Sequence, residues 1–297
     1  MAEIIRIDDP DDPRIADYRA VRERDLVGRR DLFVAEGAVV FAVLAASSRH
    51  RPVSALLDER RLDGLAETLS GLAPDVPVYA AARPVIDAIA GFPLHRGILA
   101  LGRRAPAVDP AALLSGLSER AVVVVAAGLT NHDNMGGIFR NAAAFGADAV
   151  LLDAECCDPF YRKAIRVSVG HVLNVAQARL APGADPVALL SSHGFEVLSL
   201  SPSGRERLVD VRPPPRVAVV LGTEGPGLPA EVLARSRAVS IPMAAGVDSL
   251  NVAVTSGIVL HHLTAGARKI AWQSAQDQVA ASPDELKAAA SLPQAIL

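Results

Sequence analysis

The sequence has 297 residues, of which 51% are hydrophobic and 21% are charged, and this composition excludes a largely disordered protein because it supports a sizeable buried core. Its formal net charge is −3, from 30 basic and 33 acidic residues, which argues against a protein that coats nucleic acid by bulk charge but leaves room for a local basic patch. No apolar run reaches the ~18 residues of a membrane span, so we expect no membrane association.

Residues 14–103 alternate short apolar runs with helical patterns, which predicts an α/β segment. The predicted strands are 33–34, 53–57, 76–80 and 97–101, and the predicted helices are 37–46, 59–69 and 84–90. Five arginines lie between Arg19 and Arg30, where neighbouring acids favour a solvated helix face and a phosphate-contacting edge is the alternative. We place a first, smaller α/β domain at 1–103 and a linker with a short helix at 104–120.

The patterns become sharper from residue 121 onward. The predicted strands are 121–127, 149–152, 173–176, 196–200, 217–221 and 239–241, and the predicted helices are 138–145, 161–169, 186–192, 229–234 and 250–264. A continuous apolar run such as AVVVVAA is typical of a strand buried on both faces, so we expect a parallel sheet with helices on both sides. This gives a second domain at 121–265, followed by a helical extension at 266–297.

Three polar, glycine-bearing segments follow or adjoin predicted strands, where ligand sites gather in open α/β sheets. They are NHDNMGGIFR (131–140), LGTEGPGL (221–228) and IPMAAGVDSLNVAVTSG (241–257). In the first, we expect two glycines to let the backbone approach a ligand, while Asn134 and Arg140 offer donors. In the third, Ser249 and Asn251 stand at the start of a long helix, which favours a capping hydroxyl or a bound anion. Taken singly, Asn134 indicates a turn, Glu224 a solvated carboxylate and Ser249 a helix cap.

A different interpretation of the middle segment is a nicotinamide-binding turn. Gly225, Gly227 and Ala230 match G-x-G-x-x-A after a predicted strand, and Asp248 follows at about the distance of ~20 residues expected of a ribose-binding acid. Two prolines interrupt this match, and it falls late in the chain rather than in a first strand–helix unit. The segment is not a phosphate-binding P-loop, because no Gly-Lys-Ser/Thr ends it.

The three segments together, in this order and at this spacing, resemble the SPOUT superfamily and, within it, the 2′-O-ribose RNA methyltransferases of the SpoU type. The residues that carry the resemblance are Asn134, Gly136, Arg140 and Ala142 in the first motif, Leu221, Gly222, Glu224, Gly227 and Leu228 in the second, and Ile241, Pro242, Met243, Ser249, Leu250, Asn251 and Val252 in the third. Between the first two motifs, RKAIRVSVGH is similar to a further family stretch. Asn141 and His171 depart from the family pattern, which usually has threonine or serine, and alanine, at these positions.

The resemblance spans residues 121–264 and implies a deep trefoil knot at the carboxyl end of this region. It implies that S-adenosylmethionine is held largely by backbone at Gly222, Ile241 and Leu250, and that the protein is a homodimer whose site is completed across the interface. For the long helix that begins near Leu250, a dimer face and an internal core helix are both open. The segment before residue 104 is similar in layout to a ribosomal-protein-like RNA-binding domain.

The implied reaction transfers a methyl group from S-adenosylmethionine to a ribose 2′-hydroxyl of ribosomal or transfer RNA. Arg140 matches the family's catalytic arginine, and we expect it to clamp a phosphate rather than act as a base, because a guanidinium is effectively always charged. We expect Asn134 to orient Arg140 or the ribose, Glu224 to fix its loop or pair with an arginine, and Ser249 and Asn251 to hold the ribose or methionine end. The alternatives are a catalytically silent RNA-binding protein of the same fold and a nicotinamide-dependent enzyme.

Two further expectations concern metals and location. Cys156 and Cys157 are the only cysteines, and because they are adjacent they provide no disulfide framework; two cysteines also exclude the usual four-ligand zinc site unless histidines dominate it. Because the sulfonium of the implied methyl donor is already activated, we expect no metal. The acidic start of the chain is unlike a signal peptide, so we expect a cytoplasmic protein.

Overall fold

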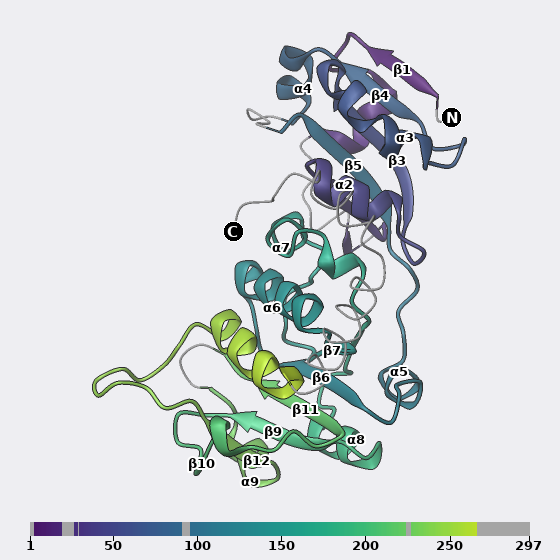
Figure 1. Ribbon diagram of the computed structural model, residues 1–297. Helices are drawn as coiled ribbons and strands as arrows, with labels where there is room; N and C mark the ends of the chain where they lie inside the picture. Colours follow the sequence, from purple (N-terminus) through teal and green to yellow (C-terminus); the bar gives the residue numbers. More distant parts are fainter. Residues whose placement is uncertain (1–2, 20–26, 29, 91–95, 224–226, 266–297) are drawn as a thin grey trace, which may run out of the picture.

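The computed structural model describes residues 3–19, 27–28, 30–90, 96–223 and 227–265, and within them the chain forms two β-sheets, one from each half of the sequence (Figure 1). The arginine-rich segment after Arg19 and the expected extension at 266–297 therefore lie largely or wholly outside the described residues. No described helix is long and apolar enough to cross a membrane.

The first sheet has five strands and is mixed. In spatial order its strands are β1 (Ile4–Ile7), β4 (Val78–Ala81), β3 (Arg51–Asp58), β5 (Ile98–Arg103) and β2 (Leu32–Glu36), with α2 (Ala38–Ala45), α3 (Ala66–Ser70) and α4 (Arg83–Ala90) in the connections. β5 runs antiparallel to β3 and β2, while the other pairs are parallel. The α/β prediction for this half is confirmed, although β1 was not among the predicted strands.

The predicted helix at 59–69 is wrong over most of its length. The chain makes two 3₁₀ turns, Glu59–Arg61 and Asp63–Leu65, before the short α3. The Asp58 side chain accepts a hydrogen bond from the backbone N–H of Arg60, which offers the backbone an alternative to helical bonding. Gly64, in the middle of the segment, further lowers the helix preference.

The second sheet has seven strands, all parallel, as predicted. In spatial order they are β10 (Glu206–Arg207), β12 (Arg237–Ser240), β9 (Glu196–Leu200), β11 (Arg216–Leu221), β6 (Ala121–Ala126), β7 (Ala149–Leu152) and β8 (Gln177–Arg179). The chain first builds outward from β6 to β8, and then crosses to the other side of β6. Because the build direction reverses between β6 and β11, the carboxyl ends of these strands are where a crevice is expected.

Helices cover both faces of this sheet (Figure 1). They are α5 (Pro110–Ser115), α6 (His132–Phe145), α7 (Arg162–Val167), α8 (Pro186–Ser192), α9 (Ala230–Ala234) and a final helix over 252–265. Along β6, Val124 and Ala126 belong to the core under α6 and the final helix, while Val123 and Val125 belong to the opposite core with α8. The alternation of buried side chains explains why the strand is apolar at every position.

The start of α6 corrects the sequence prediction. The helix begins at His132, six residues earlier than expected, so Gly136 and Gly137 lie inside it and not in a loop. A Cβ on Gly136 would stand 2.7 Å from the Ala164 carbonyl oxygen, and a Cβ on Gly137 would stand 2.6 Å from the Ala253 Cβ. The two glycines therefore let α6 pack closely on α7 and on the final helix, and do not bring loop backbone to a ligand.

The edge strands of the second sheet also differ from the prediction. Residues 173–176 are not a strand, because His171–Leu173 form a 3₁₀ turn and β8 begins only at Gln177. The two-residue β10 was not predicted, since its polar Glu206 and Arg207 carry no hydrophobic pattern.

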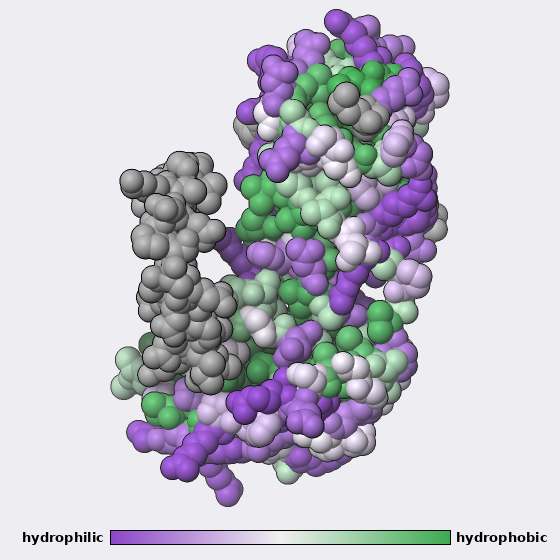
Figure 2. All heavy atoms as spheres, turned by 45° about the vertical axis from the view of Figure 1, so that its right-hand side comes forward, coloured by the Kyte–Doolittle hydropathy of each residue, from purple (hydrophilic) through white to green (hydrophobic). Residues whose placement is uncertain are grey.

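The two halves share one hydrophobic core. Side chains of β2 and α2 pack in the same cluster as those of α6 and α7. The rings of Phe33, His50 and Phe160 meet at centroid distances of 5.2–5.6 Å, and the Arg104 guanidinium stacks over Phe160 and pairs with Asp158 at 2.8 Å. Apolar side chains are also visible at the level where the halves meet, framed by hydrophilic ones (Figure 2). The junction is thus a packed interface.

Candidate functional site

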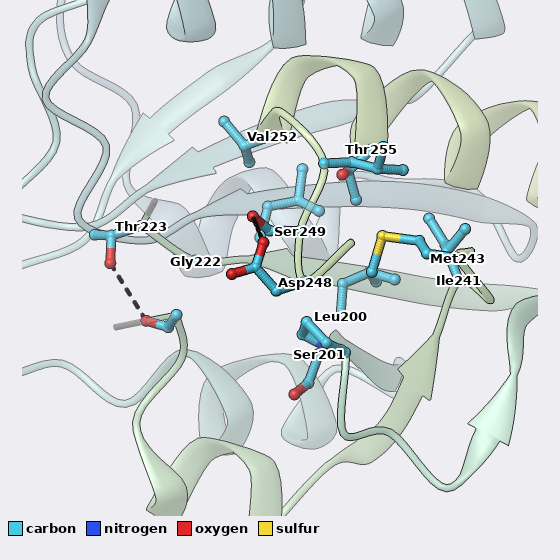
Figure 3. A pocket seen from close by; sticks show the side chains of 14 residues that line it. Leu200, Ser201, Gly222, Thr223, Ile241, Met243, Asp248, Ser249, Val252 and Thr255 are labelled. Carbon is cyan, nitrogen blue, oxygen red and sulfur yellow. Dashed lines mark hydrogen bonds between the residues drawn. The ribbon is translucent and has the colours of Figure 1, made fainter. Parts of the chain in front are cut away.

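A cavity of about 360 Å³ opens at the carboxyl ends of the second sheet. It is lined by the last residues of two strands, by residues that follow three strands, and by the start of the final helix. These are Leu200, Ser201 and Pro202 at the end of β9, Leu221, Gly222, Thr223 and Gly227 at the end of β11, Ile241, Met243, Asp248, Ser249 and Leu250 after β12, and Val252 and Thr255 in the helix. Figure 3 shows Asp248 and Ser249 side by side within it, with Ile241 and Met243 toward one end and Thr223 toward the other. A mostly apolar wall with a few polar groups is typical of a small-molecule site.

The two ends of the loop after β11 pack tightly against each other beside the cavity. A Cβ on Gly222 would stand 2.8 Å from the Gly227 carbonyl carbon and 2.9 Å from the Leu228 nitrogen, both backbone atoms that cannot swing away. The hydroxyl of Thr223 donates to the Gly227 carbonyl at 3.4 Å and closes the turn. Gly222, Thr223 and Gly227 all line the cavity, so the described ends of this loop form part of its wall.

A side-chain bridge joins the first and third polar segments. The Asn251 amide donates to the Asn134 Oδ1 at 2.8 Å, and Asn134 is buried. The Asn251 Oδ1 in turn accepts the backbone N–H groups of Ala253 and Val254 at 2.9 and 3.3 Å, so Asn251 caps the final helix. The expectation that Ser249 is the cap is wrong, because the helix begins two residues later and the Ser249 hydroxyl donates to Asp248 at 3.3 Å.

A second contact between the same two helices, two turns further along α6, strengthens this bridge. The Asn141 amide donates to the Ala253 carbonyl at 2.6 Å and to the Ser256 hydroxyl at 2.9 Å. Asn141 and Asn134 are seven residues apart on α6 and so share a face of the helix. Asn134 and Asn251 therefore fix the final helix, and with it one wall of the cavity, against α6.

Arg140 stands apart from the cavity. It is exposed on α6, does not line the cavity, and forms no hydrogen bond or ion pair with another described residue. Partial burial lowers the pKa of His171, and the nearby charge of Arg140 lowers it further. The guanidinium is thus available to an anion that arrives from outside.

The cavity brings together four of the eight residues predicted for the site: Gly222, Ile241, Ser249 and Leu250. Asn134 and Asn251 lie behind it as a bridge, Arg140 lies outside it, and Glu224 lies outside the described residues. Sequence reasoning missed Ser201 and Pro202, which directly follow the correctly predicted strand at 196–200 and could have been found by the rule that strand ends face the ligand. It also missed Thr255 of the final helix, because no motif or spacing in the sequence marks this residue as facing the cavity.

The described residues hold no cluster of histidine, cysteine, aspartate or glutamate that could bind a metal ion. Burial raises the pKa of Cys156 to about 12, and its thiol donates to the Ala126 carbonyl at 3.2 Å. Cys157 has a pKa raised to about 11, also by burial. At neutral pH both cysteines are thiols rather than thiolates, which makes them poor nucleophiles.

The nicotinamide interpretation has little support in the geometry. Gly227 takes part in a bridge with Thr223, and the helix that follows, α9, has only five residues. Asp248 does line the cavity, but it lies beside Ser249 after β12. A ribose-binding acid would instead lie at the end of the second strand of the first strand–helix–strand unit.

Comparison with known proteins agrees with this geometry. Residues 121–261 match the model of the SpoU rRNA Methylase family. The chain is 39% identical over 272 residues to an uncharacterised tRNA/rRNA methyltransferase of Mycobacterium bovis, covering 88% of this chain and 92% of that protein. It is 30% identical over 209 residues to the 23S rRNA (guanosine-2′-O-)-methyltransferase RlmB of Yersinia pestis, covering 68% of this chain and 83% of that protein.

The fold has a close counterpart among solved structures. The AdoMet-bound rRNA methyltransferase from Sinorhizobium meliloti superposes with a TM-score of 0.72 at 22% identity, over 88% of this chain and 97% of that one. This likeness shows the shared fold, and the relatives at higher identity extend over most of both chains. The chain belongs to the SpoU rRNA methylase family.

Proposed function

We propose that this SpoU-family RNA methyltransferase transfers the methyl group of S-adenosylmethionine to a ribose 2′-hydroxyl of RNA. We propose ribosomal RNA, in preference to transfer RNA, as the substrate. The observation that carries the proposal is the cavity at the carboxyl ends of β9, β11 and β12, which gathers the residues matching the second and third motifs. The acceptor and the RNA class follow the name of the relative RlmB and of the family. The first 103 residues would hold the RNA and residues 121–265 would carry out the transfer, in the cytoplasm.

The cavity fits S-adenosylmethionine in size and in the character of its walls. Leu200, Ile241 and Leu250 would supply apolar surface for an adenine ring, and Gly222, which also lines the cavity, would offer backbone groups to it. Ser249 and Asp248 supply a hydroxyl and a carboxylate for the ribose and for the positively charged methionine end. When bound, S-adenosylmethionine would supply a methyl group already activated on a sulfonium: the new O–CH3 bond forms as the S–CH3 bond breaks, S-adenosylhomocysteine leaves as a neutral thioether, and the hydroxyl proton passes to solvent water. The protein then has to position the acceptor and stabilise its negative charge.

Arg140 performs the second task in this mechanism. A guanidinium keeps its charge in proteins, so Arg140 acts as a clamp and not as a base. Bidentate hydrogen bonds to the phosphate beside the target ribose fix the hydroxyl, and the positive charge stabilises the developing alkoxide. Exposure without an acidic partner among the described residues leaves Arg140 free for that contact.

Because Arg140 does not line its own chain's cavity, the proposal includes a homodimer in which it serves the cavity of a second copy. An apolar stripe beside the cavity supports this. Val254 and Ile258 lie four residues apart on the final helix and are 53% and 39% exposed, and Leu250, just before the helix, is 37% exposed, so large apolar side chains gather at the surface here.

The trefoil knot is also part of the proposal. The strand order supports it, because β11 lies between β6 and β9 although it follows both in the chain. The segments that follow β9, β11 and β12 then converge on one cavity, as threading of one through another requires.

Titration calorimetry with S-adenosylmethionine tests the proposal directly. We expect one site per chain, and a loss of affinity of tenfold or more in Gly222→Ala, because the added methyl group meets fixed backbone. Gly64→Ala is the matched control, since a Cβ there meets nothing within 4 Å, and it should bind as the parent does. Absence of binding by the parent, with and without RNA, would refute the proposal. Binding of RNA without methyl transfer would instead favour the catalytically silent alternative.

A further inference from the structure

The charge on the described wall of the cavity is carried by one residue. Among the described residues that line the cavity, Asp248 is the only one with an ionisable side chain, since the others are apolar, hydroxyl-bearing, glycine or proline. Figure 3 shows the Asp248 side chain among these residues, beside Ser249. The described wall therefore carries a single charge, and that charge is negative.

No described neighbour neutralises the Asp248 carboxylate. Its Oδ1 accepts a hydrogen bond from the Ser249 hydroxyl at 3.3 Å, and it forms no ion pair with another described residue. Other carboxylates of this half of the chain are paired with guanidiniums, as Asp210 is with Arg207 at 2.6 Å. A hydroxyl donor leaves the charge of Asp248 in place, so the carboxylate attracts a cation that enters the cavity.

The size of the cavity sets the strength of this attraction. A cavity of about 360 Å³ is comparable in width to the Debye length of ~10 Å at 0.1 M salt, so salt does not fully screen a cation inside it from Asp248. Apolar side chains such as Leu200, Ile241 and Val252 displace water from the wall, which strengthens the interaction. Asp248 itself is exposed, so we expect the attraction of a partly solvated charge pair.

Methyl transfer changes one charge of the molecule that occupies the cavity. S-adenosylmethionine has a positively charged sulfur, whereas the sulfur of S-adenosylhomocysteine is uncharged, because the electron pair of the broken S–CH3 bond stays on it. The adenosine and amino acid parts of donor and product are the same. Apolar and backbone contacts to these shared parts therefore hold both molecules alike, and a carboxylate on the wall distinguishes them by charge.

We infer that Asp248 is a specificity-determining residue, whose carboxylate makes the cavity prefer the sulfonium of S-adenosylmethionine to the uncharged sulfur of S-adenosylhomocysteine. Loss of the positive charge during transfer then weakens the hold on the product, which is exchanged for a new donor. The Ser249 hydroxyl, which donates to Asp248, is a positioning group for the carboxylate. The inference rests on the proposed function, because it assigns a residue of the same cavity to the choice between donor and product.

The test compares the affinities for donor and product in Asp248→Asn, which removes the charge but keeps an oxygen that accepts from Ser249. Asp148→Asn is the matched control. Asp148 is exposed, accepts the backbone N–H of Val122 at 2.7 Å and directly precedes β7, at the edge of the sheet opposite the cavity. Calorimetry with S-adenosylmethionine and with S-adenosylhomocysteine, each at 50 and 300 mM salt, gives the two affinities. A third titration uses sinefungin, which carries an ammonium group in place of the methylated sulfur.

We expect Asp248→Asn to bind S-adenosylmethionine ~5-fold more weakly than the parent at 50 mM salt, the effect of one partly solvated charge pair. Sinefungin should follow the donor, while the affinity for S-adenosylhomocysteine should stay within ~2-fold, which also shows that the variant is folded. The loss should shrink at 300 mM salt, because salt screens the pair. The control should match the parent with all three ligands.

Two results would overturn the inference while leaving the proposed function standing. An equal loss for donor and product in Asp248→Asn would show that the residue holds a part common to both, or only shapes the cavity. Unchanged affinity for the donor, or an equal change in Asp148→Asn, would show that the charge of Asp248 does not select it. Failure of the parent to bind S-adenosylmethionine would count against the proposed function instead.

Discussion

Arg140 and Asn134 lie six residues apart on α6, yet they face different surroundings. Asn134 is buried and accepts a hydrogen bond from Asn251, so its effect on the cavity passes through the final helix. Arg140 is exposed, and its positive charge contributes to lowering the pKa of the nearby His171. At the residue scale, the first motif therefore combines one group that fixes the cavity wall with one that is exposed on the outer face of the helix.

Replacement of Arg140 separates these two roles. Arg140→Ala should lower the rate of methyl transfer to RNA by ~10²–10³-fold, the usual cost of removing one stabilising donor from a reacting anion. Arg140→Lys should recover part of the rate, because it restores the charge but not the bidentate geometry. The affinity for S-adenosylmethionine, measured by calorimetry, should not change, since Arg140 does not line the cavity. Near-full turnover by Arg140→Ala would show that the assigned role is wrong.

The contact between α6 and the final helix decides the shape of the cavity at the scale of whole elements. Gly137 faces Ala253, and Asn141 bonds to the Ala253 carbonyl and to Ser256, so the two helices approach closely along small residues. The final helix in turn contributes Val252 and Thr255 to the cavity. The packing of the final helix on α6 therefore determines where its cavity-lining side chains lie.

Gly137→Ala should disturb this contact. The added methyl group would stand 2.6 Å from the Ala253 Cβ, so the helices must move apart, and we expect a loss of ~1–3 kcal/mol in the free energy of unfolding in urea. Gly116→Ala is the control, because a Cβ there meets only ordinary contacts at 3.6 Å, and it should be neutral or slightly stabilising. Equal stability of the two variants would contradict the close approach of the helices.

The sequence predicts most elements of the second sheet because buried parallel strands are apolar at every position, and β9 and α8 have the predicted bounds. It fails at α6, where two adjacent glycines suggest a loop and in fact serve a tertiary contact that no local pattern reveals. For the site, the motif pattern finds Gly222, Ile241, Ser249 and Leu250. The position of Arg140 outside the cavity could not be predicted, since it depends on how α6 packs against distant segments.

The junction between the two halves links the stability of the whole molecule to pH. His50 is buried against Phe33 and Phe160, and its Nδ1 accepts the backbone N–H of Ala105 at 3.1 Å. Burial lowers the pKa of His50 to about 4, and the charges of Arg49 and Arg104 add to the effect. Folding therefore favours the neutral ring, while the unfolded chain takes up a proton near pH 6.5.

Stability should consequently fall as the pH falls from about 6.5 toward 4, because only the unfolded chain binds the proton in this window. At pH 5 the expected loss is about 2 kcal/mol relative to pH 7.5, measured by urea unfolding. His50→Gln, which keeps an acceptor for Ala105 but cannot be protonated, should show a flatter profile between pH 7.5 and 5. Parallel profiles for the parent and the variant would contradict this role of His50.

The proposed homodimer is tested on the exposed apolar side chains of the final helix. Val254→Lys and Ile258→Lys would place an unpaired charge in the interface, and we expect association to weaken by ~100-fold or more. Sedimentation velocity should show monomers, and methyl transfer should fall with the dimer because Arg140 would lose its partner cavity. Val209→Lys, at an apolar side chain that is 67% exposed elsewhere, is the control and should leave a dimer. A monomeric parent with full activity would contradict the shared site.

The most direct test of the account is the position of the transferred methyl group. Total RNA from a strain that lacks the gene is incubated with the protein and S-adenosylmethionine, then digested to nucleosides and analysed by mass spectrometry, with alkaline hydrolysis of a parallel sample. The account predicts that the parent protein, but not Arg140→Ala, restores one methyl group on a ribose and leaves an alkali-resistant dinucleotide at that site. A methyl group on a base, or no transfer to any RNA, would contradict it.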